Sequence, residues 1–250
     1  MVPPESGLYQ DSSIQVAQML SSLAQKEFLN DADSKVYQKK FVSFVDSRKE
    51  KLKDLKVEFS IIKAGYFESI NEFDESINIL EVVSSNDHFT ENHKYYLASI
   101  YEKVEEYSKA SDLMMEILEK EPKNAHAWNF LGYSLLERGV ELDKAFEYIS
   151  KAIKLSPKDG FIRDSLGWYY FKVGKIDQAL DELLTAIKLE PKDISIQKHL
   201  AVIYTTKKDF KTAKKYIVEA IKYTQQENER EELLRALKSL ESNRIPASFK

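Results

Sequence analysis

The chain has 250 residues, of which 43% are hydrophobic and 31% are charged. This composition is typical of a folded globular protein, because enough apolar surface is available to offset the entropy lost on ordering. The net charge of −4 and the even spread of lysines leave no basic face, which argues against a nucleic acid partner. No apolar run approaches the roughly 18 residues of a membrane span. The absence of cysteine excludes disulfides and thiolate metal sites.

Residues 1–56 are predicted to be a helical segment without a clear repeat signature. Apolar residues at helical spacing indicate one amphipathic helix, capped by Asp11 or Ser12, and then a second. The first is marked by Ile14, Ala17, Met19, Leu20, Leu23 and Phe28, and the second by Val36, Tyr37, Phe41, Phe44 and Val45. The charge run from Arg48 to Asp54 is typical of a solvated helix face. An eroded repeat is one interpretation of the whole segment.

A period of 34 or 35 residues dominates the rest of the chain. Pro122, Pro157 and Pro191 are 35 and 34 residues apart, in the similar phrases LEKEPKN, IKLSPKD and IKLEPKD. Two glycine pairs and two alanine series keep the same period: Gly132 and Gly167; Gly139 and Gly174; Ala110, Ala145, Ala179 and Ala213; Ala152, Ala186 and Ala220. Several residue sets with one period indicate tandem structural repeats.

Within each period the residues resemble the tetratricopeptide repeat, in which Trp, Leu-Gly, Tyr, Ala, an aromatic residue and Pro follow in order. The best copy of the opening has Trp128 and Leu131-Gly132, whereas Arg163 stands in the next copy where Trp is usual. The resemblance assigns repeats to 57–90, 91–124, 125–159, 160–193 and 194–226, with a capping helix and tail at 227–250. It implies an all-α fold, a right-handed α-solenoid of tandem antiparallel helix pairs.

The stretch 160–193 illustrates the predicted unit. Its first helix is expected at about 161–173 and its second at about 176–189, with a glycine turn between them and Pro191 as the stop. Gly167 and Ala179 are expected to let the two helix backbones approach closely. In the capping helix, Leu233, Leu234, Leu237 and Leu240 form an apolar stripe, and the tail from Ile245 is expected to fray.

No catalytic motif frames the polar residues. Phosphate-loop, dinucleotide-binding and serine-hydrolase patterns are all missing from the sequence. His88 and His93 are near each other, with Asp87 and Glu91 beside them, but they fall in a predicted loop where polar residues are common. The chain is therefore predicted to be non-catalytic and to need no cofactor or metal.

One predicted helix departs from the amphipathic pattern. Opposite its packing residues Leu166, Gly167 and Tyr170, the helix carries a second, largely aromatic face. The resemblance implies that this face lines the concave groove of the solenoid and binds a protein partner. The expected groove residues are Asn129, Tyr133, Leu136, Phe161, Asp164, Trp168, Phe171, Lys198 and Val202. Large aromatic side chains suit recognition of an extended peptide or a partner helix.

Three alternatives to this groove stay open. In the first, the aromatic rings belong to the core and are buried by solenoid curvature or by the segment around Gly7–Tyr9 of the same chain. In the second, the chain self-associates as a homo-oligomer. In the third, it serves as an accessory subunit of an enzyme complex. A chaperone-type carboxylate clamp is not expected, because the required cationic cluster is absent from the corresponding positions.

The origin and compartment are only weakly indicated. The phrase Asp164-Ser-Leu-Gly-Trp168 resembles repeats of bacterial envelope-associated tetratricopeptide proteins. This implies a bacterial protein. It leaves open the cytoplasm and, if a leader segment was removed, the periplasm or cell envelope.

Overall fold

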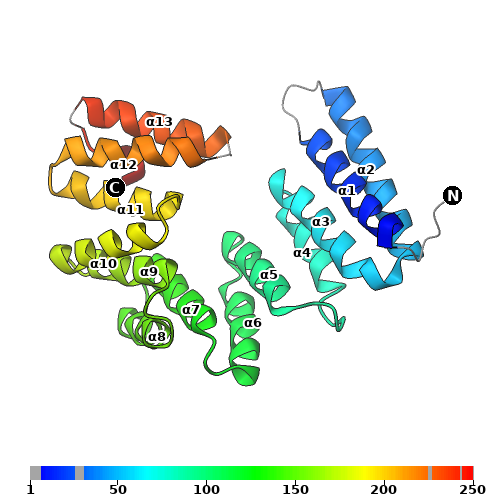
Figure 1. The fold of residues 1–250 in the computed structure, drawn as a ribbon, viewed down its shortest axis with the longest axis horizontal. Coiled ribbons are helices and arrows are strands. Elements are labelled where there is room, and N and C mark those ends of the chain that lie inside the picture. The colour runs from blue at the N-terminus through cyan, green and yellow to red at the C-terminus, as the bar shows by residue number, and fades with distance from the viewer. Residues whose placement is uncertain (1–6, 26–30, 225–226, 243, 250) are drawn as a thin grey trace. The chain divides into compact units, whose positions relative to one another are not determined.

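The computed structural model describes residues 7–25, 31–224, 227–242 and 244–249 (Figure 1). These ranges form thirteen α-helices and two short 3₁₀ helices, and they contain no strand. The chain divides into two compact units, Met1–Glu116 and Ile117–Lys250. The boundary falls within a helix of the repeat predicted at 91–124.

The N-terminal unit is built from helix pairs. Its elements are α1 (Gly7–Ala24), α2 (Asp31–Lys51), the 3₁₀ helix η1 (Lys53–Leu55), α3 (Lys56–Ser69), α4 (Phe73–Glu81) and α5 (Glu91–Lys103), and α6 (Tyr107–Lys120) contains the boundary. The α1–α2 and α3–α4 pairs each pack side by side (Figure 1). Ala17 of α1, Phe41 and Val45 of α2, and Phe59 and Tyr66 of α3 belong to one buried cluster. The apolar side of α1 is thus used within this unit.

Several predictions for this region are wrong. Because α1 begins at Gly7, Asp11 and Ser12 lie inside the helix and do not cap it. Met19 is 64% exposed and Val36 is 47% exposed, so the apolar faces are narrower than the pattern predicts. Phe28 lies outside the described residues. The charged run does not form one helix face either, because α2 ends at Lys51 and the chain turns through η1 into α3.

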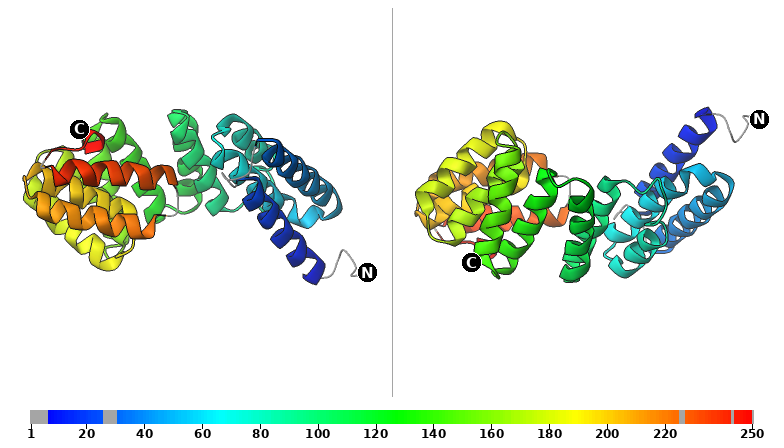
Figure 2. Two further views of the ribbon diagram at one scale, coloured as in Figure 1. Left: turned by 90° about the horizontal axis from the view of Figure 1, so that it is seen from above. Right: turned by 90° about the horizontal axis from the view of Figure 1, so that it is seen from below.

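The C-terminal unit contains three helical hairpins and a final helix. Its elements are α7 (Ala125–Arg138), α8 (Leu142–Leu155), α9 (Gly160–Lys172), α10 (Ile176–Leu189), α11 (Ile194–Thr206), α12 (Phe210–Tyr223), α13 (Glu227–Glu241) and η2 (Ala247–Phe249). The pairs α7–α8, α9–α10 and α11–α12 pack closely, and α13 lies along α12 (Figure 2). This arrangement is the expected solenoid of tandem helix pairs.

Glycine permits the close packing inside the hairpins. A Cβ atom on Gly132 would lie 2.7 Å from Cγ1 of Ile149 and 2.9 Å from the carbonyl oxygen of Ala145. A Cβ atom on Gly167 would lie 3.2 Å from the carbonyl oxygen of Ala179. The distances at Gly132 are too short for a side chain, and a Cβ atom on Gly167 would also lie 2.7 Å from Cγ of Leu183, so the predicted approach of the two helices is confirmed.

The start of each hairpin is bonded to its own preceding turn. The Trp128 Nε1–H group donates to the Pro122 carbonyl at 3.0 Å. One repeat later the Nε–H of Arg163 donates to the carbonyl of Pro157 at 2.9 Å. Then Nε2 of Gln197 donates to the carbonyl of Pro191 at 3.0 Å. Three different side chains therefore make the same bond, which explains why Arg163 can replace the usual tryptophan.

Part of the C-terminal tail packs against the last helices, while the expectation that the tail frays stays a prediction. Pro246 is buried, and the Phe249 ring packs against the cluster that contains Leu233 and Leu240. Leu233 and Leu240 are buried as predicted, whereas Leu234 is 46% exposed. The tail thus covers apolar surface of the last helices.

Candidate partner-binding site

The predicted groove residues lie on the first helices of three successive hairpins. Asn129, Tyr133 and Leu136 are on α7; Phe161, Asp164, Trp168 and Phe171 are on α9; Lys198 and Val202 are on α11. Tyr133, Phe171 and Val202 pack around the cluster that contains Trp168. The structure therefore brings together side chains that are one repeat apart in the sequence.

Trp168 is the centre of this cluster and is only 8% exposed. Its ring stacks on the imidazole of His199, with centroids 4.0 Å apart, and on the ring of Phe171 at 4.9 Å. Its Nε1–H donates to the Glu137 carboxylate at 2.6 Å, and the Lys172 ammonium lies 5.2 Å from the ring centroid. The ring is thus held by the chain's own side chains, which differs from the open ligand contact expected for it.

Asp164 is also buried, and its carboxylate is partnered from α11. It lies 2.8 Å from Nδ1 of His199. Burial raises the pKa of the neighbouring Tyr133 phenol, and the charges of Glu137 and Asp164 raise it further. The phenol therefore stays neutral in this environment, where it can donate a hydrogen bond.

The remaining residues differ widely in accessibility. Leu136 is fully buried, so it supports the face from behind and cannot meet a ligand directly. Phe161 is 47% exposed on the first turn of α9. The Lys198 ammonium lies 3.7 Å from the carboxylate of Glu229 on α13. Asn129 has a buried side-chain oxygen with no hydrogen-bond partner among the described residues.

We call the accessible part of this region the first-helix face. It consists of Asn129, Tyr133, Phe161, Phe171, Lys198 and Val202. Sequence reasoning missed three side chains that organise it, namely Glu137, Lys172 and His199. His199 lies 35 positions after Asp164, in the first helix of the next repeat. This spacing of about one repeat is the sequence signal that could have identified His199 as the partner of Asp164.

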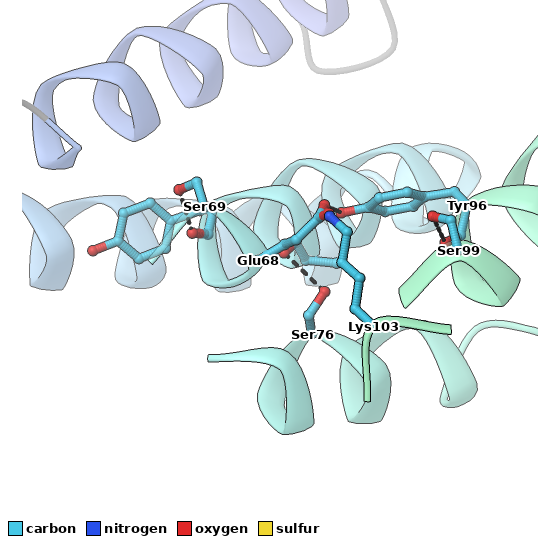
Figure 3. Close-up of polar contacts among 8 residues, drawn as sticks. Glu68, Ser69, Ser76, Tyr96, Ser99 and Lys103 are labelled. Carbon is cyan, nitrogen blue, oxygen red and sulfur yellow. Dashed lines mark hydrogen bonds and ion pairs between the residues drawn. The ribbon is translucent and has the colours of Figure 1, made fainter. Parts of the chain in front are cut away.

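A polar cluster joins helices of the N-terminal unit. Glu68 of α3 accepts a hydrogen bond from the Tyr96 hydroxyl at 2.7 Å and pairs with the Lys103 ammonium, both from α5 (Figure 3). Ser76 of α4 donates to the carbonyl of Ala64 at 2.9 Å. These contacts join α3 to α5 and to α4.

A metal site is not supported at the clustered histidines. Nδ1 of His93 accepts the backbone N–H of Thr90 at 3.1 Å, as part of the box that caps α5. His88 is exposed. Among the described residues, no group of three His, Asp or Glu side chains could hold a metal ion.

The sequence matches known family models over the repeat region. Residues 95–160 match a model described as tetratricopeptide repeat, and residues 163–193 and 199–227 match a second model of the same description. These stretches make up half of the chain. The chain belongs to the tetratricopeptide repeat family. This membership supports a protein-interaction scaffold.

Curated relatives share only part of their length with this chain. A TPR repeat-containing protein of Pseudomonas aeruginosa is 31% identical over 109 residues, which are 44% of this chain and 16% of the relative. The general transcriptional corepressor trfA of Dictyostelium discoideum is 30% identical over 126 residues, which are 50% of this chain and 9% of the corepressor. The chain thus matches less than a fifth of either relative's length.

Solved structures show the same fold. A tetratricopeptide repeat protein from Parabacteroides merdae is 16% identical, with a TM-score of 0.67 over 94% of both chains. Yeast Tom70 is 16% identical, with a TM-score of 0.66 over 93% of this chain and 47% of Tom70. In the described part of the chain, no helix is both long and apolar enough to cross a membrane.

Proposed function

We propose that this chain is a non-catalytic scaffold that binds a peptide or helix of a protein partner on its first-helix face. The observation that carries the proposal is Phe161, a large ring left 47% exposed on a face otherwise organised by buried rings. Exposed aromatic side chains give much contact area at a low cost in conformational entropy. Tyr133, Phe171 and Val202 are only partly buried and pack around the cluster that contains Trp168, so they add apolar side chains to the same set of first helices.

The buried layer beneath the face supports its use in binding. Trp168 is stacked and hydrogen-bonded, and Asp164 is paired with His199, so neither has to rearrange when a partner arrives. A face whose side chains are already fixed loses less entropy on binding. We therefore propose that Trp168, Asp164 and Leu136 hold the binding face in position. The residues of the first-helix face would contact the partner directly.

The alternative in which the N-terminal segment fills the groove is less well supported. The α1 helix packs on α2 and α3, and the Tyr9 ring lies 5.3 Å from the guanidinium of Arg48. The apolar side of α1 is therefore already covered within the N-terminal unit. Residues 1–6 and the side chain of Leu8 lie outside the described residues.

Affinity capture with quantitative mass spectrometry tests the proposal. We expect Phe161→Ser to reduce recovery of the partner by roughly thirtyfold, the effect of losing a binding hot spot. Phe146→Ser is the matched control, because Phe146 of α8 is also exposed, at 37%, but lies outside the first-helix face. Phe161→Ser should keep the melting temperature within about 2 °C of the parent, since its ring is partly solvated, whereas Phe146→Ser should lower it further because the Phe146 ring stacks on Tyr169 at 4.9 Å.

Two outcomes would change the assignment. Retention of every partner by Phe161→Ser, with loss in Phe146→Ser, would move binding away from the first-helix face. Light scattering could instead show that the parent chain is a dimer at low micromolar concentration and that Phe161→Ser is a monomer. The partner would then be a second copy of the chain.

A further inference from the structure

The charged run near the end of α2 folds into an open hollow. Because the chain turns through η1 between α2 and α3, charges that are spread along the sequence gather around one space. The hollow has a volume of about 670 Å³ and is lined by Asp46, Lys49, Glu50, Lys53, Lys56 and Asn86. These residues come from α2, η1, the first residue of α3 and the loop after α4.

Positive charge is in excess in this hollow. The ammonium of Lys63 lies 2.9 Å and 3.1 Å from the two carboxylate oxygens of Asp46, so that carboxylate is already neutralised. Lys49, Lys53 and Lys56 form no ion pair within the described residues. Three ammonium groups therefore face one remaining carboxylate, that of Glu50.

Lys49 experiences this excess most directly. Its side chain is partly buried, and burial lowers the pKa of its ammonium. Repulsion from Lys63 and Lys56 lowers the pKa further, and Asp46 offsets only part of the effect. A bound anion would supply the missing negative charge.

A neutral hydrogen-bond donor accompanies the lysines. The Asn86 side-chain oxygen accepts the backbone N–H of His88 at 2.9 Å, which leaves its NH₂ group to act as a donor.

We propose that this hollow binds a phosphate group through Lys49, Lys53, Lys56 and Asn86. A phosphate carries more than one negative charge and several acceptor oxygens, which suits separate ammonium groups better than a single carboxylate would. The same chemistry is offered by a soluble phosphorylated compound and by an anionic lipid headgroup. The site is independent of the first-helix face and lies in the N-terminal unit.

Titration calorimetry with inorganic pyrophosphate on the full chain tests the soluble source. We expect Lys53→Gln to weaken binding by roughly tenfold in the dissociation constant, the effect of losing one hydrogen bond to a charged group. Lys39→Gln is the matched control, because Lys39 is an exposed lysine of α2 away from the hollow. Glu50→Gln should tighten binding, because it removes the carboxylate that opposes the anion. Higher salt should weaken binding.

Sedimentation with vesicles of phosphatidylcholine, with and without phosphatidylglycerol, tests the lipid source. Binding only to the anionic vesicles, lost in Lys53→Gln and kept in Lys39→Gln, would assign the site to a lipid headgroup. Binding to pyrophosphate with the same dependence, and none to vesicles, would assign it to a soluble ligand. The proposal fails if the parent chain binds neither probe, if Lys53→Gln binds like the parent, or if Glu50→Gln weakens binding.

A stability measurement checks the premise separately. Lys49→Gln removes a partly buried charge that is repelled by its neighbours, so it should raise the melting temperature without ligand. It should also abolish any rise that pyrophosphate causes in the parent. A lower melting temperature for Lys49→Gln without ligand would overturn the picture of an uncompensated positive hollow.

Discussion

The two units connect successive helices with different chemistry. In the N-terminal unit, phenol hydroxyls donate to carboxylates, from Tyr96 to Glu68 at 2.7 Å and from Tyr101 to Glu81. In the C-terminal unit, α9 and α11 meet through the stacked rings of Trp168 and His199, with hydrogen bonds from Trp168 to Glu137 and between His199 and Asp164 beside them. The same repeat length thus accommodates contacts made by phenol hydroxyls in one unit and by a stacked tryptophan in the other.

This difference has energetic consequences. A stacked, buried tryptophan contributes through the apolar area it removes from water, at about 25 cal/mol per Å². A hydrogen bond between a phenol and a carboxylate contributes only about 1–2 kcal/mol net, because both groups were solvated before folding. We therefore expect substitutions of the stacked rings in the C-terminal unit to reduce stability more than substitutions of the phenol–carboxylate pairs in the N-terminal unit.

The largest predicted effect is at Trp168. Trp168→Ala should cost about 3–5 kcal/mol of unfolding free energy in the C-terminal unit, because it opens a cavity and leaves the rings of His199 and Phe171 without their partner. Urea unfolding followed by fluorescence measures it, since the other tryptophan, Trp128, lies in the same unit. A cost below about 1 kcal/mol would mean that the stack contributes little.

A matched glycine pair gives the next effect. Gly132→Ala should destabilise the C-terminal unit by about 1–3 kcal/mol, because the new Cβ would lie 2.9 Å from a backbone oxygen. Gly65→Ala in α3 should be neutral or stabilising by up to about 1 kcal/mol, because the nearest atom is the Tyr96 hydroxyl at 3.6 Å. Hydrogen exchange resolves the two units in one chain. Equal losses of stability in Gly132→Ala and Gly65→Ala would mean that close helix packing is not what distinguishes the two glycines.

The smallest effect concerns the phenol of Tyr96. Tyr96→Phe should cost about 1 kcal/mol at neutral pH, because Glu68 keeps its pairing with Lys103. Burial raises the pKa of this phenol above its usual value of 10.0, and the bond to Glu68 raises it further. The stability tied to its neutral form is therefore complete below about pH 10 and is lost as the pH rises from there through the higher pKa of the folded state.

Alkaline unfolding checks that sign. The Tyr96→Phe variant should lose less stability than the parent above about pH 10, although Tyr101, whose pKa is raised in the same direction, keeps part of the effect. Tyr223→Phe is the matched control, because Tyr223 is an exposed tyrosine at the end of α12. Identical alkaline curves for the parent and Tyr96→Phe would show that this phenol is not held neutral by the fold.

Most of the hairpin geometry could be predicted from the sequence. The second helix of 160–193 is predicted at 176–189 and is Ile176–Leu189, and the first begins and ends within one residue of its prediction. Glycine turns, proline stops and apolar spacing are local signals, so they determine where helices begin and end. The start of α1 lacks such signals, and the prediction of its capping residue is wrong.

The buried layer of the candidate site could not be predicted in the same way. The contacts of Trp168 with Glu137 and of Asp164 with His199 join residues 31 and 35 positions apart. Apolar spacing does not encode which polar side chains of neighbouring hairpins will meet. The resemblance implies that Trp168 faces a ligand, with a buried core ring as the alternative left open by the sequence; the ring is buried and stacks on an imidazole from the next hairpin.

The bonds from Trp128, Arg163 and Gln197 to the proline carbonyls make the start of each hairpin a local property of the chain. Each of these bonds spans six positions, so the entry of a first helix needs no information from the hairpin before it. A whole repeat could therefore be inserted or deleted between two of these prolines without disturbing how the next hairpin starts. Such an array can gain or lose whole repeats even when different side chains donate the hydrogen bond to the proline carbonyl.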